Sequence, residues 1–370
     1  MQNYCSMIHG GLFLNFTEKD VLAIHCCLRS DLSRVDLKTF WTSEKFQELR
    51  RFNESGQWHS GCSNCQALEA SQQPSFREGM NQGLGVYGQT DLSGPARIDL
   101  KFDLSCNLAC RICAPDSSTF WQKHLKNHGE WDQIVSSPRD KKDVIAALSN
   151  LDLTNLKMLV FCGGETLLGQ EYWDVGKWFV DTVPDAKKDL TMCFQTNGTQ
   201  TIHPRNFETI DRCHLVKLHI SLDGVGEKFE YQRWPASWNQ TIDNLFDLRE
   251  KLPSNVMFLV EETISIFNLY YLGELDEWVQ QNYTTNREGD PNIHSKHLAK
   301  FTFDIRDCLT QEYVDAMQNS PYCNLIDPNW QEQPAKIQKM IAEIQKFDGY
   351  RNQDWRQTFP EVAEFYRRYL

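Results

Sequence analysis

"RIDLKFDLSCNLACRIC", residues 97–113, joins a strand-like alternation of apolar and polar residues to a loop that carries three cysteines. The alternation has the period of a β-strand with one buried face. The cysteines of the loop have the spacing Cys-x3-Cys-x2-Cys and are Cys106, Cys110 and Cys113. A structural zinc site usually takes four protein ligands and a disulfide takes two sulfurs. Three thiolates therefore indicate a metal centre that keeps one position open.

The chemistry of the ligands narrows the kind of centre. Thiolates are soft ligands that favour iron–sulfur clusters, zinc or copper(I). A [4Fe–4S] cluster normally takes four cysteines, so a loop that supplies three leaves one iron free to bind a substrate or a cofactor. Because the triplet follows directly after the first strand of a longer series, we expect an iron–sulfur site at the end of that strand.

Strand-like and helix-like segments alternate after about residue 95. The strand-like segments are 97–104, 156–161, 190–195, 215–222, 256–265 and 300–305, and the helical patterns between them include 140–151, 170–183, 238–252 and 271–281. Strands that alternate with helices predict βα units and a parallel sheet. Six such units are typical of either a doubly wound sheet or a partial barrel.

The two faces of the predicted strands differ in polarity. In the segment 215–222, Leu218 and Ile220 alternate with His219 and Ser221. Parallel strands that are buried on both faces usually read as continuous apolar runs. A polar face opposite a helix-packing face favours an α/β fold with a partial (β/α)6 barrel similar to a TIM barrel, whose wide polar interior holds a ligand. A doubly wound sheet is the alternative.

Composition excludes several classes of protein. The chain has 370 residues, 41% of them hydrophobic, and a net charge of −12 without a basic tract, which argues against nucleic-acid binding. No apolar run is long enough to cross a bilayer, and the first residues do not have the pattern of a signal peptide, so we expect a cytoplasmic protein with no membrane association. Thirteen cysteines in such a chain favour metal or redox chemistry over disulfides.

Composition also suggests boundaries. Residues 66–96 are rich in Gly, Gln and Ser and have little apolar pattern, which is typical of a connector. We therefore expect an N-terminal module with its connector at 1–95, the barrel at 96–308 and a C-terminal extension at 309–370. Helical patterns at 334–347 and 360–370 predict that the extension caps the mouth of the barrel.

The loop and the ends of the later strands resemble the radical S-adenosylmethionine (SAM) superfamily. "CNLACRIC" resembles its cluster loop, "FCGGETL" (161–167) its Gly-Gly-Glu motif, and "TNGT" (196–199) and "ISLDG" (220–224) close the next strands as expected. The resemblance covers about residues 97–305. It implies an enzyme that cleaves SAM reductively at a three-cysteine [4Fe–4S] cluster and forms a 5′-deoxyadenosyl radical, which abstracts hydrogen from a substrate.

The same resemblance implies a set of residues that bind the cofactor. Glu165 and the backbone of the preceding glycines would hold the SAM amino group, and Arg233 would pair with the SAM carboxylate. The position before the third cysteine is often aromatic in the superfamily and is Ile112 here, which leaves the adenine without that stacking partner. The full set is Ile112, Gly163, Gly164, Glu165, Asn197, Ser221, Asp223 and Arg233.

A second group of cysteines precedes the barrel: Cys5, Cys26, Cys27, Cys62 and Cys65. If one member of the adjacent pair Cys26 and Cys27 is a ligand, the group supplies the four thiolates that a complete metal site takes. Strand alternation points Cys26 and Cys27 in opposite directions, so we expect only one of them to be a ligand. The order of these cysteines resembles the SPASM or twitch modules of radical SAM enzymes, here placed before the barrel. It implies a second, auxiliary [4Fe–4S] cluster, with a structural zinc ion as the alternative.

The auxiliary cluster, which in SPASM and twitch relatives often takes up an electron or contacts the substrate, favours a peptide substrate that is crosslinked or epimerised in natural-product maturation. Epimerisation needs a thiol that returns a hydrogen atom, and Cys308 and Cys193 are the candidates. An external donor such as flavodoxin or ferredoxin would supply electrons.

Two alternatives stay open. Charged residues of the strands would suit dehydrogenation, rearrangement or carbon–heteroatom bond formation on a sugar, nucleotide or amino acid; they are Lys217, His219, Glu261, Asp304 and Arg306. A non-catalytic iron–sulfur or zinc protein is the alternative of another class. The sequence leaves substrate identity, oligomeric state and the fate of SAM open.

Overall fold

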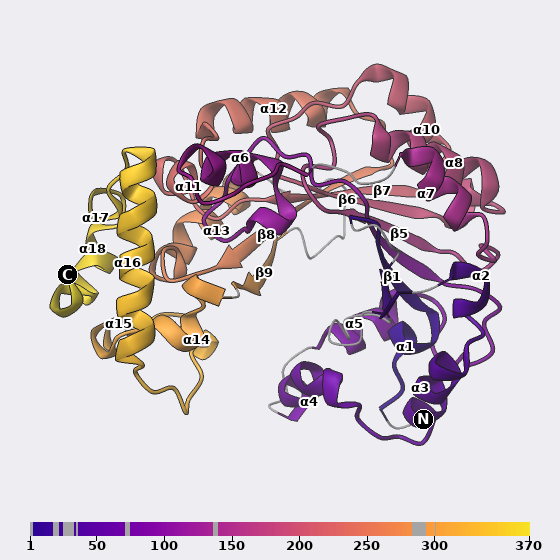
Figure 1. Ribbon diagram of the computed structural model, residues 1–370, viewed down its shortest axis with the longest axis horizontal. Coiled ribbons are helices and arrows are strands. Elements are labelled where there is room, and N and C mark those ends of the chain that lie inside the picture. Colours follow the sequence, from indigo (N-terminus) through magenta and orange to yellow (C-terminus); the bar gives the residue numbers. More distant parts are fainter. Residues whose placement is uncertain are drawn as a thin grey trace.

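One curved sheet runs through the protein, as a computed structural model shows (Figure 1). The structure describes residues 3–17, 22–24, 33–34, 36–70, 75–135, 140–282, 294–299 and 301–370. The strands are β1 (Gly11–Asn15), β2 (Leu22–Ile24), β3 (Ser33–Arg34), β4 (Arg97–Lys101), β5 (Met158–Cys162), β6 (Thr191–Thr196), β7 (Leu215–Ser221), β8 (Val256–Ile264) and β9 (His294–Leu298). Among the described residues their order is β3-β2-β1-β4-β5-β6-β7-β8-β9, with β3 and β9 at the edges.

The strands β4 to β9 are parallel, and helices connect them. The connecting helices are α6 (Thr119–Asn127), α7 (Lys141–Leu148), α8 (Glu171–Thr182), α9 (Ala186–Asp189), α10 (Phe207–Asp211), α11 (Glu227–Gln232), α12 (Trp238–Lys251) and α13 (Leu272–Asn282), with 3-10 turns η3 (Pro115–Ser117), η4 (Pro204–Asn206) and η5 (Leu269–Tyr271). Six parallel strands in a curved, open sheet confirm the prediction of a partial (β/α)6 barrel.

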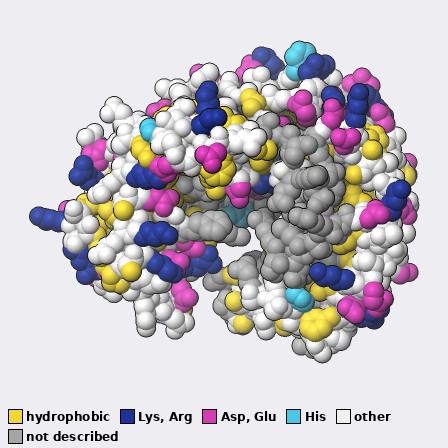
Figure 2. Space-filling view, viewed as in Figure 1, with side chains coloured by type: hydrophobic (Ala, Val, Ile, Leu, Met, Phe, Trp, Pro, Cys, Tyr) yellow, Lys and Arg dark blue, Asp and Glu magenta, His cyan; other side chains and the backbone are white. Residues whose placement is uncertain are grey.

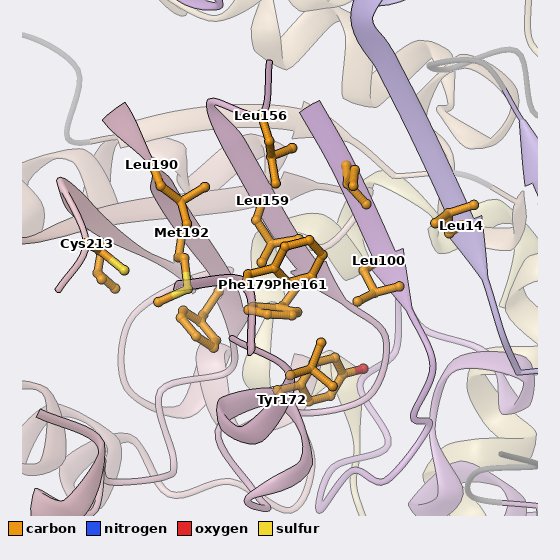
Figure 3. Close-up of a cluster of buried hydrophobic side chains, with 14 of the residues drawn as sticks. Leu14, Leu100, Leu156, Leu159, Phe161, Tyr172, Phe179, Leu190, Met192 and Cys213 are labelled. Atoms are coloured by element: carbon orange, nitrogen blue, oxygen red, sulfur yellow. The ribbon is translucent and has the colours of Figure 1, made fainter. Parts of the chain in front are cut away.

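The two faces of the sheet differ as the sequence indicates. In β7 the buried residues Val216, Leu218 and Ile220 alternate with partly exposed ones, and β8 alternates in the same way. The apolar face packs against the outer helices: Figure 3 shows Leu100, Phe161 and Met192 on neighbouring strands directed toward the same cluster. Each fully buried Leu or Phe contributes about 1.5–3 kcal/mol. The opposite face is therefore left for polar side chains.

The N-terminal segment extends the same sheet. Its strand β1 pairs in parallel with β4, with Leu12 opposite Ile98 and Leu14 opposite Leu100. The helices of this part are α1 (Ser6–Gly10), α2 (Leu37–Phe40), α3 (Glu44–Glu54), η2 (Ser60–Cys62), α4 (Ser63–Ala70) and α5 (Phe76–Gly83). The expected connector thus contains α5, which begins with a capping box between Ser75 and Glu78. The capping box thus stabilises a helix in a segment whose Gly- and Gln-rich composition predicted a connector.

The C-terminal part forms a second hydrophobic cluster beside the last barrel strands. It consists of η6 (Phe301–Phe303), α14 (Ile305–Cys308), α15 (Gln311–Met317), η7 (Cys323–Leu325), α16 (Pro334–Arg351), α17 (Trp355–Thr358), α18 (Pro360–Phe365) and η8 (Arg367–Tyr369). Figure 1 shows these elements together at the end of the sheet that carries β9. The predicted helices at 334–347 and within 360–370 are confirmed.

The sixth strand lies earlier in the chain than predicted. The segment 300–305 was expected to be a strand, but Phe301–Phe303 is a 3-10 turn and α14 follows it. The Asp304 carboxylate accepts a hydrogen bond from the backbone N–H of Arg306 at 2.9 Å, so it caps a helix there. The actual strand, β9, is the polar segment "HSKHL", which carries no apolar alternation.

No helix in the described ranges is both long and apolar enough to cross a membrane. Figure 2 shows acidic and basic side chains intermixed over the visible face.

Candidate functional site

The three-cysteine loop follows the C-terminal end of β4, and backbone hydrogen bonds hold it on one side. The N–H of Ala109 donates to the carbonyl of Trp234 at 2.8 Å, and the N–H of Arg111 donates to the carbonyl of Gln232 at 2.7 Å. On the other side, the Ser118 hydroxyl donates to the carbonyl of Leu108 at 2.6 Å. These hydrogen bonds fix the loop between α6 and the segment at the end of α11.

Cys106, Cys110 and Cys113 all line one cavity of about 860 Å³. Burial, together with a smaller contribution from the neighbouring Cys110, raises the pKa of the Cys106 and Cys113 thiols to about 12. Thiols with such pKa values are protonated at neutral pH, and they become ligands when a cationic metal core displaces the protons. One buried and two partly buried cysteines on one cavity wall fit a cluster with one open corner.

Gly163 and Gly164 bring the loop after β5 against the backbone that leads into the cysteine loop. A Cβ on Gly164 would lie 2.1 Å from the carbonyl oxygen of Ser105, and one on Gly163 would lie 2.5 Å from that of Asp103. Gly163 also has φ +133°, a backbone conformation that residues other than glycine rarely adopt. Both glycines line the cavity, so this close approach forms part of its wall.

Glu165 is buried at the cavity wall and binds the end of β6. Its carboxylate accepts hydrogen bonds from the Thr196 hydroxyl and the Asn197 N–H, both at 2.6 Å, and from the Leu167 N–H at 3.0 Å. Burial raises the pKa of Glu165, although these hydrogen bonds act to lower it. An ammonium group in the cavity would stabilise the ionised carboxylate.

Asn197 connects the end of β6 to the cysteine loop. Its Nδ2 donates to Asn107 Oδ1 at 3.0 Å, and its Oδ1 accepts from the Thr199 N–H at 3.0 Å. Asn197, Ser221 and Ile112 all line the cavity.

Arg233 and Asp223 form a buried ion pair beside the cysteine loop. Arg233 Nη2 lies 2.7 Å from Asp223 Oδ2, and Arg233 Nη1 lies 3.9 Å from Cys110 Sγ. Arg233 lines the cavity, whereas Asp223 is absent from its wall and accepts a further bond from the Thr263 N–H at 2.8 Å. Asp223 therefore orients Arg233 from behind.

Cys193 and Cys308 lie in different surroundings, and neither is among the residues that line this cavity. Cys193 is buried in β6 opposite Lys217, and its thiol interacts with the His219 ring. Cys308 lies at the end of α14 in the C-terminal hydrophobic cluster, where its thiol donates to the Thr302 carbonyl at 3.2 Å.

Of the charged residues predicted to face the barrel interior, His219 and Glu261 meet there. His219 Nδ1 lies 2.5 Å from Glu261 Oε1, on the neighbouring strand β8. Burial lowers the pKa of His219, but Cys193 and Glu261 more than offset this effect and raise it to about 9. Asp304 and Arg306 instead pair with each other at the start of α14, because no strand forms there.

Of the N-terminal cysteines, Cys5, Cys62 and Cys65 are buried, while Cys26 and Cys27 lie outside the described residues. Arg77 joins the segments that carry them. Its Nη1 donates to the carbonyl of Tyr4, next to Cys5, at 2.6 Å, and its Nε donates to Glu69, one helical turn beyond Cys65, at 2.8 Å.

Part of the cavity wall comes from residues that sequence reasoning missed. Phe347 and Glu343 of α16 line the cavity together with Trp121 of α6. Asp348, the next residue of α16, pairs with Arg111 inside the cysteine loop at 2.5 Å. The alternation of charged and aromatic residues in "QKFDGYRNQDW" (345–355) was the available signal, since a purely packing helix does not need buried charges near its end.

Residues 104–268 match the Radical SAM superfamily. The match covers the part of the chain from the cysteine loop to the end of β8, and over this range the chain is similar to radical SAM enzymes. No curated protein matches the chain.

Two solved structures are similar to the chain at low identity. Native anSMEcpe with bound AdoMet is 15% identical, with a TM-score of 0.40 over 70% of this chain and 62% of that one. Streptococcus suis SuiB bound to precursor peptide SuiA is 10% identical, with a TM-score of 0.39 over 98% of this chain and 75% of that one. The chain thus spans less than two thirds of the length of anSMEcpe.

Proposed function

We propose that the protein binds a [4Fe–4S] cluster and SAM in the cavity at the end of β4 and abstracts a hydrogen atom from a peptide. The observation that carries the proposal is the convergence of all three loop cysteines, Glu165 and Arg233 on one cavity of about 860 Å³. When bound, the cluster and SAM supply a 5′-deoxyadenosyl radical after one-electron reduction. The protein's own residues hold these groups and keep water away.

Each wall of the cavity suits one part of the cofactors. Cys106, Cys110 and Cys113 hold the cluster. Glu165 and the Gly163–Gly164 backbone accept the SAM ammonium group, because the carboxylate is the buried anion of that wall. The Arg233 guanidinium takes the SAM carboxylate, since a planar cation forms paired hydrogen bonds to such a group. The polar residues Asn197 and Ser221 contact the remainder of SAM, and Ile112 covers its adenine with an apolar surface.

The lining of the cavity suits a peptide substrate. It includes the exposed residues Asp116 and Glu130 and the partly buried Ser221. Side-chain amides and hydroxyls along it, including Gln195 and Thr302, can bond to a peptide backbone. The two reactions proposed are crosslinking and epimerisation. A small metabolite is the second candidate, and the His219–Glu261 pair favours it because a charged pair in the barrel can fix a polar ligand.

Cys193 is the better candidate for a hydrogen donor in an epimerisation. Its neighbour Gln195, two residues along the same face of β6, lines the cavity. Cys308 is directed to the Thr302 carbonyl within an apolar cluster, so it needs a rearrangement before its thiol can reach a substrate.

We also propose that the N-terminal cysteines hold an auxiliary [4Fe–4S] cluster. Cys5, Cys62 and Cys65 supply three buried thiols, and either Cys26 or Cys27 supplies the fourth. The Arg77 bridge supports the proposal because it joins the segment of Cys5 to the helix of Cys65. Residues 1–95 then act as the auxiliary-cluster module, 96–308 as the barrel and 309–370 as the extension. The external electron donor is flavodoxin or ferredoxin in the cytoplasm.

The test is anaerobic reconstitution of the full chain with iron and sulfide, followed by SAM and dithionite. The expected products are methionine and 5′-deoxyadenosine, and Cys106→Ala, Cys110→Ala and Cys113→Ala should each abolish them. Cys323→Ala, which changes an exposed cysteine, is the matched control. A reconstituted protein that binds iron but forms no 5′-deoxyadenosine would favour a non-catalytic iron–sulfur protein.

The substrate class needs a second experiment. Peptides encoded beside the gene are incubated with the active enzyme in D₂O and analysed by mass spectrometry. Crosslinking removes two hydrogen atoms from the peptide, whereas epimerisation replaces one carbon-bound hydrogen by deuterium and leaves the composition otherwise unchanged. If such peptides stay unmodified while small metabolites are consumed, the peptide proposal is wrong.

A further inference from the structure

Arg351, the last residue of α16, is a buried cation with unused hydrogen-bond donors. It is 7% exposed, and its guanidinium lies 4.6 Å from the ring centre of Trp121 and 4.9 Å from that of Trp234. Its Nε lies 3.5 Å from His124 Nε2, but neither Nη1 nor Nη2 has a partner among the described residues. Burying a charge without full hydrogen bonding is costly. Among the described side chains, this cost is offset by the stacking on aromatic rings and by the single contact with His124, and no carboxylate pairs with the charge.

The unused charge lies next to the cysteine loop. The Trp121 indole, which stacks against Arg351, donates its Nε1–H to the carbonyl oxygen of Cys110 at 2.8 Å. Trp121 lines the cavity together with Cys110. One indole ring therefore separates the Arg351 guanidinium from the backbone of the central cysteine of the loop.

Of the three buried arginines near Cys110, Arg351 is the one without a carboxylate partner among the described residues. Arg111 pairs with Asp348 at 2.5 Å, and Arg233 pairs with Asp223 at 2.7 Å. For Arg351 no ion pair is found within the described part of the chain. A cluster held by three thiolates is an anion, and it gains one more negative charge when it is reduced. The negative charge of such a cluster would balance the positive charge of Arg351.

We propose that Arg351 is a positioning residue that stabilises the reduced cluster bound by Cys106, Cys110 and Cys113, and so raises its reduction potential. The attraction between a buried cation and the cluster strengthens with each added electron, because little water screens it. The inference rests on the proposed function of the loop. A residue at the end of α16 would then help to set the reduction potential of the cluster.

The test is a potentiometric titration of the reconstituted full chain followed by electron paramagnetic resonance. The signal that changes when SAM is added belongs to the cluster with the open iron. Arg351→Met keeps a long apolar side chain but removes the charge. We expect its equilibrium constant for reduction to fall about tenfold or more, which corresponds to about 59 mV for a one-electron couple. Arg351→Lys should keep most of the wild-type potential.

A second variant removes the net charge without removing the guanidinium. His124→Glu places a carboxylate where the ring now lies 3.5 Å from Arg351 Nε, and it should lower the potential in the same direction. The matched control is Arg356→Met, which removes an exposed arginine of the same region that is paired with Asp354. This control should leave the potential unchanged.

The outcomes separate the inference from the function on which it rests. If wild-type protein binds no SAM-sensitive cluster, the proposed function fails. The inference is wrong if the cluster is present but its potential stays at the wild-type value in His124→Glu and in every Arg351 variant that retains the cluster. Arg351 then serves only to stack α16 on α6.

Discussion

The Arg233 guanidinium lies between a carboxylate and a thiol: Asp223 Oδ2 is 2.7 Å from its Nη2, and Cys110 Sγ is 3.9 Å from its Nη1. Asp223 is fully buried and does not reach the cavity, whereas Arg233 does. The pair thus holds a cation at the junction of the cluster loop and the proposed SAM site. Its orientation depends on a residue that SAM itself does not touch.

Asp223→Asn removes the negative charge behind Arg233. Breaking one side of a buried ion pair costs about 3–5 kcal/mol, so the melting temperature should fall. The SAM dissociation constant should rise at least tenfold, about 1.4 kcal/mol, because the guanidinium loses its fixed direction. Equilibrium dialysis with labelled SAM measures this. Asp247→Asn, at an exposed pair with Lys251, is the control and should change neither quantity. Unchanged SAM affinity would show that Asp223 does not orient Arg233.

Gly164→Ala should prevent the cluster loop from closing. The added Cβ would meet the Ser105 carbonyl oxygen at 2.1 Å, and backbone atoms cannot move aside as a flexible side chain can. Overpacking costs about 1–3 kcal/mol, and here it also displaces the segment before Cys106. We expect reduced iron content and no 5′-deoxyadenosine. Gly273→Ala, where no atom lies within 4 Å, should be neutral or stabilising. Full iron loading of Gly164→Ala would contradict the prediction.

The His219–Glu261 pair predicts a pH-dependent contribution to stability. The folded pKa of His219, about 9, is above its ordinary value of 6.5. The stabilisation is therefore fully present below about pH 6.5 and is lost as the pH rises through about 9. Glu261→Gln should lower the His219 pKa in an NMR titration. It should also reduce the melting temperature most between the pKa of Glu261 and that of His219, with little difference above pH 9. Glu364→Gln, an exposed control, should leave both unchanged.

Removing the N-terminal thiols tests the auxiliary cluster apart from the barrel. Cys62→Ala and Cys65→Ala together should remove about half of the iron, since one of two [4Fe–4S] clusters is lost. The SAM-sensitive signal should persist because its ligands lie in another loop. Elemental analysis and Mössbauer spectroscopy measure both effects. Wild-type protein that contains zinc in place of the second cluster would contradict the proposal and support the structural alternative.

The barrel could be predicted from the sequence because its strands show two-faced alternation. In β7 the pattern from Leu215 to Ser221 fixes which side chains face the helices. The strand β9 could not be found in this way, because "HSKHL" contains one apolar residue and its pairing with β8 comes from tertiary contacts. Local propensity carries little information about an edge strand of this kind.

Only some residues of the candidate site could be predicted from the sequence. Cys106, Glu165 and Arg233 could be named because a motif marks each of them, and the structure brings them to one cavity. Asp223 stands in a motif too, yet its place behind Arg233 becomes visible only in three dimensions. Phe347 and Arg351 are far along the chain, and a helical pattern alone does not tell which face of α16 meets the cluster loop.

The contact between Arg111 and Asp348 sets an order of events during synthesis. These residues are 237 positions apart in the chain. At about 5–20 residues per second, the ribosome needs roughly 12–50 s to reach Asp348 after it has made the cysteine loop. Throughout that interval the α16 wall of the cavity does not exist. The lining that Glu343 and Phe347 of α16 contribute is therefore the last part of the cavity to be synthesised.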